Sequence, residues 1–301
     1  MEGKQVRDAL PEAVIYVLDG LFAGQADFYI ANNLRPSLVS PEDLSEWADA
    51  ADGKHKAAIH IDTGINRLGF DRAQAEVLAG DAELMSRAGL CLLMSHLARG
   101  DDETNAANAR QRDLFAGLRK LFPGLPASLA NAPGTFLGPD FSHDLVRPGV
   151  ALYGGNPLSG KPNPMRCVVS LTAPILQVRD VAAGDGVGYG ATWRAHRPSR
   201  IAIAGVGYAD GLVRAMSWPA HQDGPAQVCI AGQMAPIVGR VSMDMITIDV
   251  TDIDPERVCR GTKAELLGIN IGVDDWAHWS GTLPYEILTS LGRRYAKVYS
   301  S

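Results

Sequence analysis

The sequence predicts an α/β fold in which a (β/α) barrel, incomplete with about six of its eight strands, is followed by an antiparallel β domain. In the first half, short apolar runs alternate with amphipathic stretches, which is typical of a parallel sheet. From about residue 166, strand-like runs follow one another through Gly-rich turns. The stretch "NPLSGKPNPMR" (156–166) separates the two patterns, and its Pro, Gly and Asn content favours a boundary. We therefore expect domains at 1–160 and 161–301.

The strands of the first domain are predicted from apolar runs bounded by polar turns. They cover residues 14–20, 35–40, 57–64, 91–97, 126–132 and 150–155. A closed (β/α) barrel requires eight strands. Either the sheet is open or two strand–helix units are missing.

Helices are predicted between these strands. One begins at Ser40, a good N-cap, with Pro41 at the first helical position and acidic residues after it. Its apolar residues from Leu44 to Ala51 repeat with a helical period. Further helices are expected over 71–88 and 103–121, and short ones near 273–280 and 284–291.

Composition excludes several classes of function. The chain has 301 residues, is 46% hydrophobic and carries a net charge of −6. Its Lys and Arg are scattered, so nucleic acid is not an expected partner. No apolar stretch is long enough to span a membrane. The four cysteines and seven histidines lack the spacing of a disulfide framework or metal site, and a reducing cytoplasm fits best.

Polar residues at the ends of predicted strands are the first candidates for chemistry, because active sites of parallel α/β folds lie at the carboxyl ends of strands. They include Arg67, His96, Arg147 and Gly149. The side chains have structural alternatives: a surface cation for Arg67, a hydrogen-bonded histidine for His96 and an ion-pair partner for Arg147. For Asp62, which precedes Arg67 in the chain, the alternative is a residue that caps a turn. Gly149 also offers a backbone N–H that could hold an anion such as phosphate.

The β domain adds two candidates. "GVGYADG" places Tyr208 and Asp210 among glycines that let other atoms approach closely. A phenol donates a proton at neutral pH unless a neighbour helps it lose that proton. "VGRVSMDM" places Met243 at a turn. The alternatives are a buried tyrosine with a satisfied hydroxyl and a methionine packed in the core.

Seven motifs of the chain resemble those of the alanine racemases, in the same order, over residues 2–299. They are "DTGINRLGF", "SHLARGDD", "LVRPGVALYGG", "VGYGATWRA", "VGYADGL", "VGRVSMDMITIDVTD" and "YEILTSLGRRY". The resemblance implies a barrel followed by a β domain and a pyridoxal 5′-phosphate cofactor bound by the first domain. It implies interconversion of L-alanine and D-alanine, which supplies cell-wall precursors.

The resemblance also implies roles for individual residues. Arg147 would face the pyridine nitrogen, and the amides of Gly149 and Val150 would hold the phosphate. His96 would link Arg147 to Tyr208. Tyr208 would be one of the two bases, and Arg67 with the backbone of Met243 would bind the substrate carboxylate side. In this family Tyr208 and Met243 would be donated across the interface of a homodimer.

The second base of the family is a lysine that forms the Schiff base with the cofactor, in a phrase close to Lys-Ala-Asn-Ala-Tyr-Gly. None of the seven lysines stands in such a phrase. The predicted strand count agrees, and together they indicate an N-terminally truncated racemase. We expect this chain as written to have negligible racemase activity and to fold poorly alone.

Three further positions depart from the family pattern. His60 stands where many members carry a modified lysine, Ala132 where a serine touches phosphate, and Arg293 where some members have an entrance tyrosine. Two other functions remain open: a racemase of broader range that accepts serine, and a non-catalytic remnant that binds a phosphate ligand or a partner.

Overall fold

A computed structural model describes residues 1–219 and 224–299. The chain divides into two compact units, Met1–Gly149 (unit 1) and Val150–Ser301 (unit 2). The predicted boundary at 160 to 161 lies further along the chain, and it remains a prediction about independent domains.

Unit 1 contains an open sheet of five parallel strands in the order β1-β2-β3-β4-β5. The strands are β1 Tyr16–Val17, β2 Arg35–Leu38, β3 Ala57–His60, β4 Leu90–Met94 and β5 Ala127–Ser128. Sequential parallel order with a crossover between neighbours is the arrangement of a (β/α) barrel. The predicted incomplete barrel is therefore confirmed, with five strands in place of six.

The expected sixth strand at 150–155 is wrong. Gly149–Tyr153 form a 3₁₀ helix, η2. Gly149 has a φ of 46°, a left-handed conformation that turns the chain out of the extended geometry a strand needs. Just before it, Arg147 donates its backbone N–H to the carbonyl of Ala130 at 2.9 Å, so the chain passes beside β5 without continuing as a strand.

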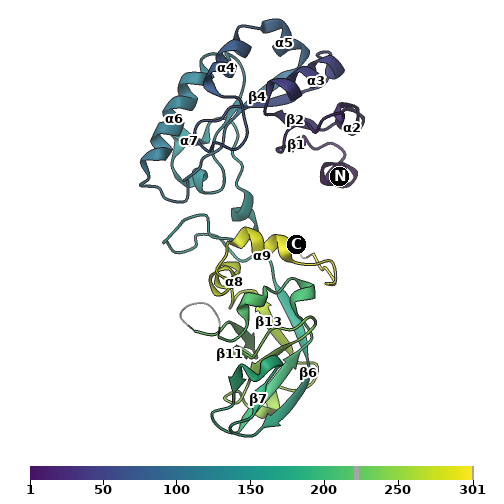
Figure 1. The fold of residues 1–301 in the computed structure, drawn as a ribbon, viewed down its shortest axis with the longest axis vertical. Coiled ribbons are helices and arrows are strands. Elements are labelled where there is room, and N and C mark those ends of the chain that lie inside the picture. The colour runs from purple at the N-terminus through teal and green to yellow at the C-terminus, as the bar shows by residue number, and fades with distance from the viewer. Residues whose placement is uncertain (220–223, 300–301) are drawn as a thin grey trace. The chain divides into compact units, whose positions relative to one another are not determined.

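Helices and one 3₁₀ segment surround this sheet (Figure 1), although α1 buries no residue. They are α1 Glu2–Ala9, α2 Ala26–Ala31, α3 Pro41–Ala51, α4 Arg72–Ala79, α5 Ala82–Arg87, α6 Ala106–Arg119, η1 Pro133–Phe136 and α7 Pro139–Ser142. Apolar side chains such as Trp47, Phe115 and Ile59 are fully buried between helices and strands. Burial of this apolar surface is the main force that holds the helices on the sheet.

The predicted start of α3 is confirmed, α6 begins at Ala106 instead of near 103, and one predicted helix is two. Ser40 accepts a hydrogen bond from the N–H of Asp43, and the carboxylate of Asp43 accepts one from the N–H of Ser40, which is a capping box. The predicted helix over 71–88 breaks at Gly80, a weak helix former, because Asp81 caps a second helix by accepting from the N–H of Leu84 at 2.9 Å.

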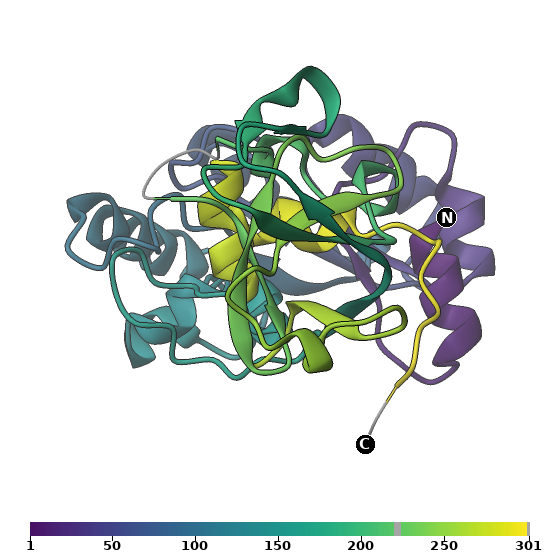
Figure 2. The same cartoon turned by 90° about the horizontal axis from the view of Figure 1, so that it is seen from below.

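Unit 2 is built around a closed antiparallel barrel with the strand order β10-β11-β12-β9-β6-β13. Figure 2 shows its strands from one end. The strands of the unit are β6 Leu171–Val181, β7 Gly186–Val187, β8 Trp193–Arg194, β9 Ser199–Ala204, β10 Gln227–Ile230, β11 Gln233–Val238, β12 Ile246–Asp249 and β13 Lys263–Leu267, where β7 and β8 form a separate hairpin. The predicted antiparallel β domain is confirmed.

Helices α8 Val273–Ser280 and α9 Pro284–Ser290 lie where the sequence predicts short helices. Short 3₁₀ segments complete the unit: η3 Tyr189–Ala191, η4 Tyr208–Asp210, η5 Arg214–Met216 and η6 Pro255–Arg257. Trp276 of α8 is fully buried and donates its indole N–H to the carbonyl of Leu266 at 2.6 Å. This contact attaches α8 to β13.

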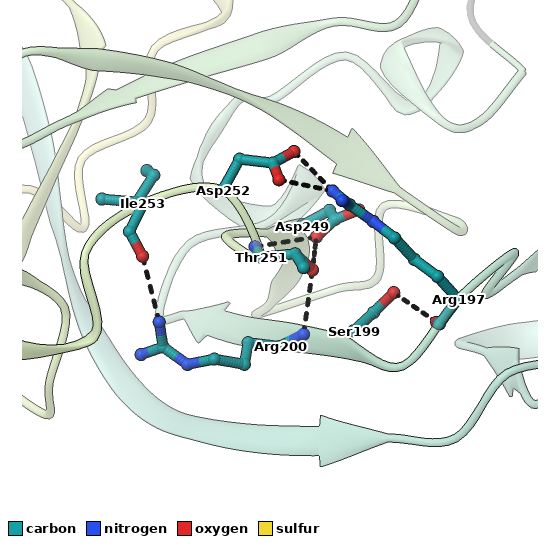
Figure 3. Close-up of polar contacts among 7 residues, drawn as sticks. All are labelled: Arg197, Ser199, Arg200, Asp249, Thr251, Asp252 and Ile253. Carbon is teal, nitrogen blue, oxygen red and sulfur yellow. Dashed lines mark hydrogen bonds and ion pairs between the residues drawn. The ribbon is translucent and has the colours of Figure 1, made fainter.

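A polar cluster joins the start of β9 to the turn after β12 (Figure 3). Arg197 reaches both carboxylate oxygens of Asp252, at 2.5 and 2.6 Å, and Thr251 accepts from the backbone N–H of Arg200 at 3.0 Å. Arg197 and Asp252 are 55% and 80% exposed, so solvent screens their charges and the pair contributes little to stability. The cluster orders the turn and does not indicate a binding site.

No helix in the part of the chain that the structure describes is long and apolar enough to cross a membrane.

The capping box of α3 provides a test of this fold. Ser40→Ala removes the side-chain acceptor of the Asp43 N–H, and we expect the free energy of unfolding to fall by about 1 kcal/mol. Ser45→Ala, at an exposed position inside the same helix, is the control and should be neutral or slightly stabilising. Urea unfolding followed by circular dichroism measures both. Equal stability of the two variants would contradict the cap.

Candidate functional site

The carboxyl ends of β3, β4 and β5 carry a cluster of polar side chains in unit 1. His60 ends β3, Ser95 and His96 follow β4, and Ser128 ends β5. Parallel strands bring their carboxyl ends to one edge of the sheet, which explains why residues so distant in sequence gather there. Arg147 reaches this edge and joins the strand ends.

Arg147 is held by its two terminal nitrogens. Nη1 donates to the hydroxyl of Ser128, and Nη2 donates to the carbonyls of Ser95 at 2.5 Å and Leu129 at 3.3 Å. Its Nε is buried and has no hydrogen-bond partner among the described residues. Burial lowers the pKa of Arg147 to about 10, so the guanidinium still carries its charge at neutral pH. A fixed cation therefore presents a buried Nε–H donor without an acceptor.

His96 is neutral beside this cation. Burial, and then the charge of Arg147, lower the pKa of His96 to about 4. Asn131 settles its tautomer: Oδ1 of Asn131 accepts from the N–H of Gly134 at 3.1 Å, so Nδ2 is the amide donor that lies 3.2 Å from Nε2 of His96. Nε2 is then the acceptor and Nδ1 carries the proton.

His60 is a second neutral histidine at the same edge. It is 5% exposed, and burial followed by the charge of Arg147 lowers its pKa to about 4. Its Nε2 is buried without a partner in the described chain. The charge of Arg67 also lowers the pKa of His60.

Arg67 lies on the loop 62–69, whose ends are tied together. Asp62 accepts from the N–H groups of Gly64, Ile65 and Asn66 at 2.9 to 3.0 Å. This confirms the structural alternative for Asp62 as a turn cap. Gly69 has a φ of 115°, and a Cβ there would meet the N atom of Asp62 at 2.8 Å, so the loop closes only with glycine. Arg67 itself is exposed.

Gly149 and Val150 begin η2. The first N–H groups of a helix have no acceptor within it, so these amides are available to an anion. Ala132, between Asn131 and η1, is 1% exposed and carries no hydroxyl. A phosphate contact through a side chain at this position is therefore absent.

In unit 2 the structure brings together the turns that carry Tyr208 and Met243. Tyr208 donates its backbone N–H to the carbonyl of Ser242, and Ala209 donates to the carbonyl of Met243, both at 3.0 Å. A Cβ on Gly207 would lie 2.3 Å from the carbonyl oxygen of Ser242, so glycine is required for this contact. The close approach that the glycines of "GYADG" permit is thus backbone packing within the unit.

Both side chains point away from the core. Tyr208 is 42% exposed and Met243 is 54% exposed, so the core-packing alternative for each is wrong. Asp210 accepts from the N–H of Gly207 at 2.9 Å. Arg294 lies 3.4 Å from Asp210 and 2.8 Å from Asp244, and so joins the two turns.

Arg293, next to Arg294, is exposed and has no hydrogen bond or ion pair within the described ranges. Ser95, Ser128, Asn131 and Arg294 were not singled out from the sequence. Ser95 and Ser128 are fully buried polar residues at the ends of apolar strands, a signal that could have identified them.

The lysines of unit 1 lie elsewhere. Lys54 and Lys56 precede β3, Lys120 ends α6 before β5, and Lys4 pairs with Asp8 in α1. None of these four described residues follows the carboxyl end of a strand. The described residues also contain no group of three or more His, Cys, Asp or Glu that could hold a metal ion.

Comparison with known families matches both halves of the chain. Residues 1–157 match the N-terminal domain of alanine racemase, and residues 168–299 match its C-terminal domain. Among individual proteins, the alanine racemase of Methylobacterium sp. (strain 4-46) is 49% identical over 301 residues, which are 99% of this chain and 81% of that protein. That of Acidiphilium cryptum (strain JF-5) is 46% identical and is covered over 82% of its length.

Comparison with solved structures indicates the same family. The alanine racemase of Bartonella henselae, determined with covalently bound pyridoxal phosphate, is 36% identical with a TM-score of 0.90, over 99% of this chain and 82% of that one. The biosynthetic alanine racemase of Pseudomonas aeruginosa is also 36% identical, with a TM-score of 0.87, over 100% of this chain and 83% of that one. The sequence, the two-part architecture and these similarities together show that the chain belongs to the alanine racemase family.

Proposed function

We propose that this chain binds pyridoxal 5′-phosphate and a small amino acid in an alanine racemase site, and that as given it supplies only one of the two bases that racemisation needs. The observation that supports this most is Arg147, whose Nε is buried without a partner while both terminal nitrogens are bound by strand ends. A buried donor without an acceptor is costly, and a pyridine nitrogen is an acceptor of suitable shape.

The remaining donors also fit this cofactor. The amides of Gly149 and Val150 would bind its phosphate, although Ala132 supplies no hydroxyl. Pyridoxal phosphate, when bound, supplies an electron-withdrawing ring that acidifies the α-hydrogen of an amino acid. The guanidinium of Arg147 opposite the ring nitrogen would disfavour a proton there, and this would limit how strongly the ring withdraws electrons and discourage side reactions.

Tyr208 would move the proton on one face of the substrate α-carbon. Because Nε2 of His96 accepts from Asn131, its Nδ1–H would be the group that donates to the Tyr208 hydroxyl. Arg147 would act on His96 through its charge. Arg67 and the backbone of Met243 would bind the substrate carboxylate side. The exposure of Tyr208 and Met243 supports their donation to a second subunit, as in a homodimer of this family. The backbone bonds between their turns would fix the two groups relative to each other.

The second face of the α-carbon requires an amine base. Of the seven lysines, the four in unit 1 lie away from the carboxyl edge of its sheet, and the others belong to unit 2. Without a lysine at this edge there is neither a second base nor a nucleophile to bond the cofactor.

The first test is turnover. We expect the chain, incubated with pyridoxal phosphate and L-alanine, to form no D-alanine above the rate without protein, as detected with a D-amino-acid oxidase. Borohydride reduction followed by peptide mass spectrometry should find no single lysine that carries the cofactor. Turnover at the rate of a full-length family member would refute the proposed loss of the second base.

The second test concerns Arg147. Arg147→Lys keeps the charge but removes the two terminal nitrogens that bind the strand ends and the Nε–H that would meet the cofactor, and we expect pyridoxal phosphate to bind at least about tenfold more weakly. Absorbance titration measures the dissociation constant. Arg110→Lys on the exposed face of α6 is the matched control and should leave binding unchanged. If both variants bind alike, Arg147 does not face the cofactor.

The third test concerns the neutral state of the two histidines. His60 and His96 have pKa values of about 4 in the folded chain against 6.5 ordinarily, so below pH 6.5 the unfolded state binds more protons. Stability should therefore fall as pH falls from about 6.5 to 4, by on the order of 3 kcal/mol for the pair after allowance for the partial exposure of His96. The double variant His60→Asn, His96→Asn should lose less stability over this window in urea titrations. An unchanged pH dependence would show that neither ring is buried neutral.

A further inference from the structure

Gln111 is a polar residue in the middle of the buried face of α6. The buried side chains of this helix are Asn108, Gln111, Phe115 and Leu118, a spacing that faces the sheet. Gln111 is 2% exposed. A buried side-chain amide must satisfy its donors and acceptor within the protein.

All three hydrogen bonds of Gln111 go to the segments that follow β3 and β4. Oε1 accepts from the backbone N–H of Ala98 at 2.8 Å, and Nε2 donates to the carbonyl of His96 at 2.9 Å and the hydroxyl of Thr63 at 3.2 Å. The N–H of Ala98 can only donate and the carbonyl of His96 can only accept, so the orientation of the amide is fixed. One side chain thus binds the main chain on both sides of Leu97.

The same contacts lead to Arg147. The hydroxyl of Thr63 lies 2.7 Å from the hydroxyl of Ser95, and the carbonyl of Ser95 accepts from Nη2 of Arg147 at 2.5 Å. Thr63 and Ser95 are both buried. Gln111 is therefore connected to His96 through its own carbonyl and to Arg147 through two hydroxyl groups and a carbonyl.

We propose that Gln111 is a positioning residue of the cofactor site: its amide holds the segment 95–98 in the conformation that presents His96 and the Ser95 carbonyl to Arg147. It does not touch cofactor or substrate. This role rests on the proposed function of Arg147 and His96, but its test does not require cofactor.

The test is the proton affinity of His96 in the full chain without cofactor, measured by NMR titration of its ring carbon. Gln111→Met keeps length and bulk but removes all three hydrogen bonds. We expect the segment 95–98 to loosen, water to reach His96, and its proton affinity to rise about tenfold toward the ordinary value. Hydrogen exchange at the Ala98 amide should accelerate by about tenfold or more, because it loses its acceptor.

Asn108→Ala is the matched control. Asn108 is buried on the same helix face, and its side chain donates to the carbonyl of Asp102 at 2.8 Å. We expect this variant to lower the melting temperature while the proton affinity of His96 and the exchange of Ala98 stay as in the parent chain. If Gln111→Met behaves in the same way, its role is only structural and the proposal is overturned.

Thr63→Val provides a second variant should Gln111→Met fail to fold. It removes the hydroxyl between Gln111 and Ser95 and leaves the bonds to His96 and Ala98 in place. The proton affinity of His96 should rise less than tenfold but measurably, and no rise would overturn the link through Ser95 to Arg147. Titration of the parent chain with pyridoxal phosphate separates the two proposals: failure to bind would refute the proposed function and leave the His96 result standing.

Discussion

The candidate site of unit 1 depends on one buried cation held by strand ends. Arg147 comes from the segment after β5 and is bound by Ser95 and Ser128, which follow or end β4 and β5. Its charge, together with burial, keeps His96 and His60 neutral. Its Nε is buried without an acceptor and is available to a ligand at the same edge. Removal of the acceptors around Arg147 would leave its charge buried and unpaired, which is costly.

Unit 2 holds two exposed side chains, those of Tyr208 and Met243, on turns that are fixed by backbone contacts. Tyr208 and Met243 lie on turns with little apolar burial of their own, so backbone hydrogen bonds and close packing replace side-chain contacts. Gly207 allows the two main chains to touch, and Asp210 closes its turn through the N–H of Gly207. A larger residue at Gly207 would separate the turns whatever its polarity.

Local signals predicted the elements well where they were strong. Ser40 and Pro41 marked the start of α3, and the helical spacing from Leu44 to Ala51 marked its buried face. The exception in the sheet, the 3₁₀ helix at Gly149, arose because an apolar run of six residues does not distinguish a strand from a turn of helix. The φ of 46° at Gly149 decided between them, and no apolar pattern reports that angle.

By itself, the sequence determined the family and the two-part fold. It also predicts site residues through the family motifs, among them Arg147, His96, Tyr208 and Met243, and their roles stay predictions. The family and the fold follow from local patterns and short motifs, which can be identified in the sequence without a structure. Only the tertiary structure decided which hydrogen-bond partners these side chains have. Ser95 and Ser128 bind Arg147, and Asn131 sets the tautomer of His96. Gln111 reaches the segment after β4. These partners lie 15 to 52 residues apart along the chain, and their hydrogen bonds form only when the sheet and its helices have packed.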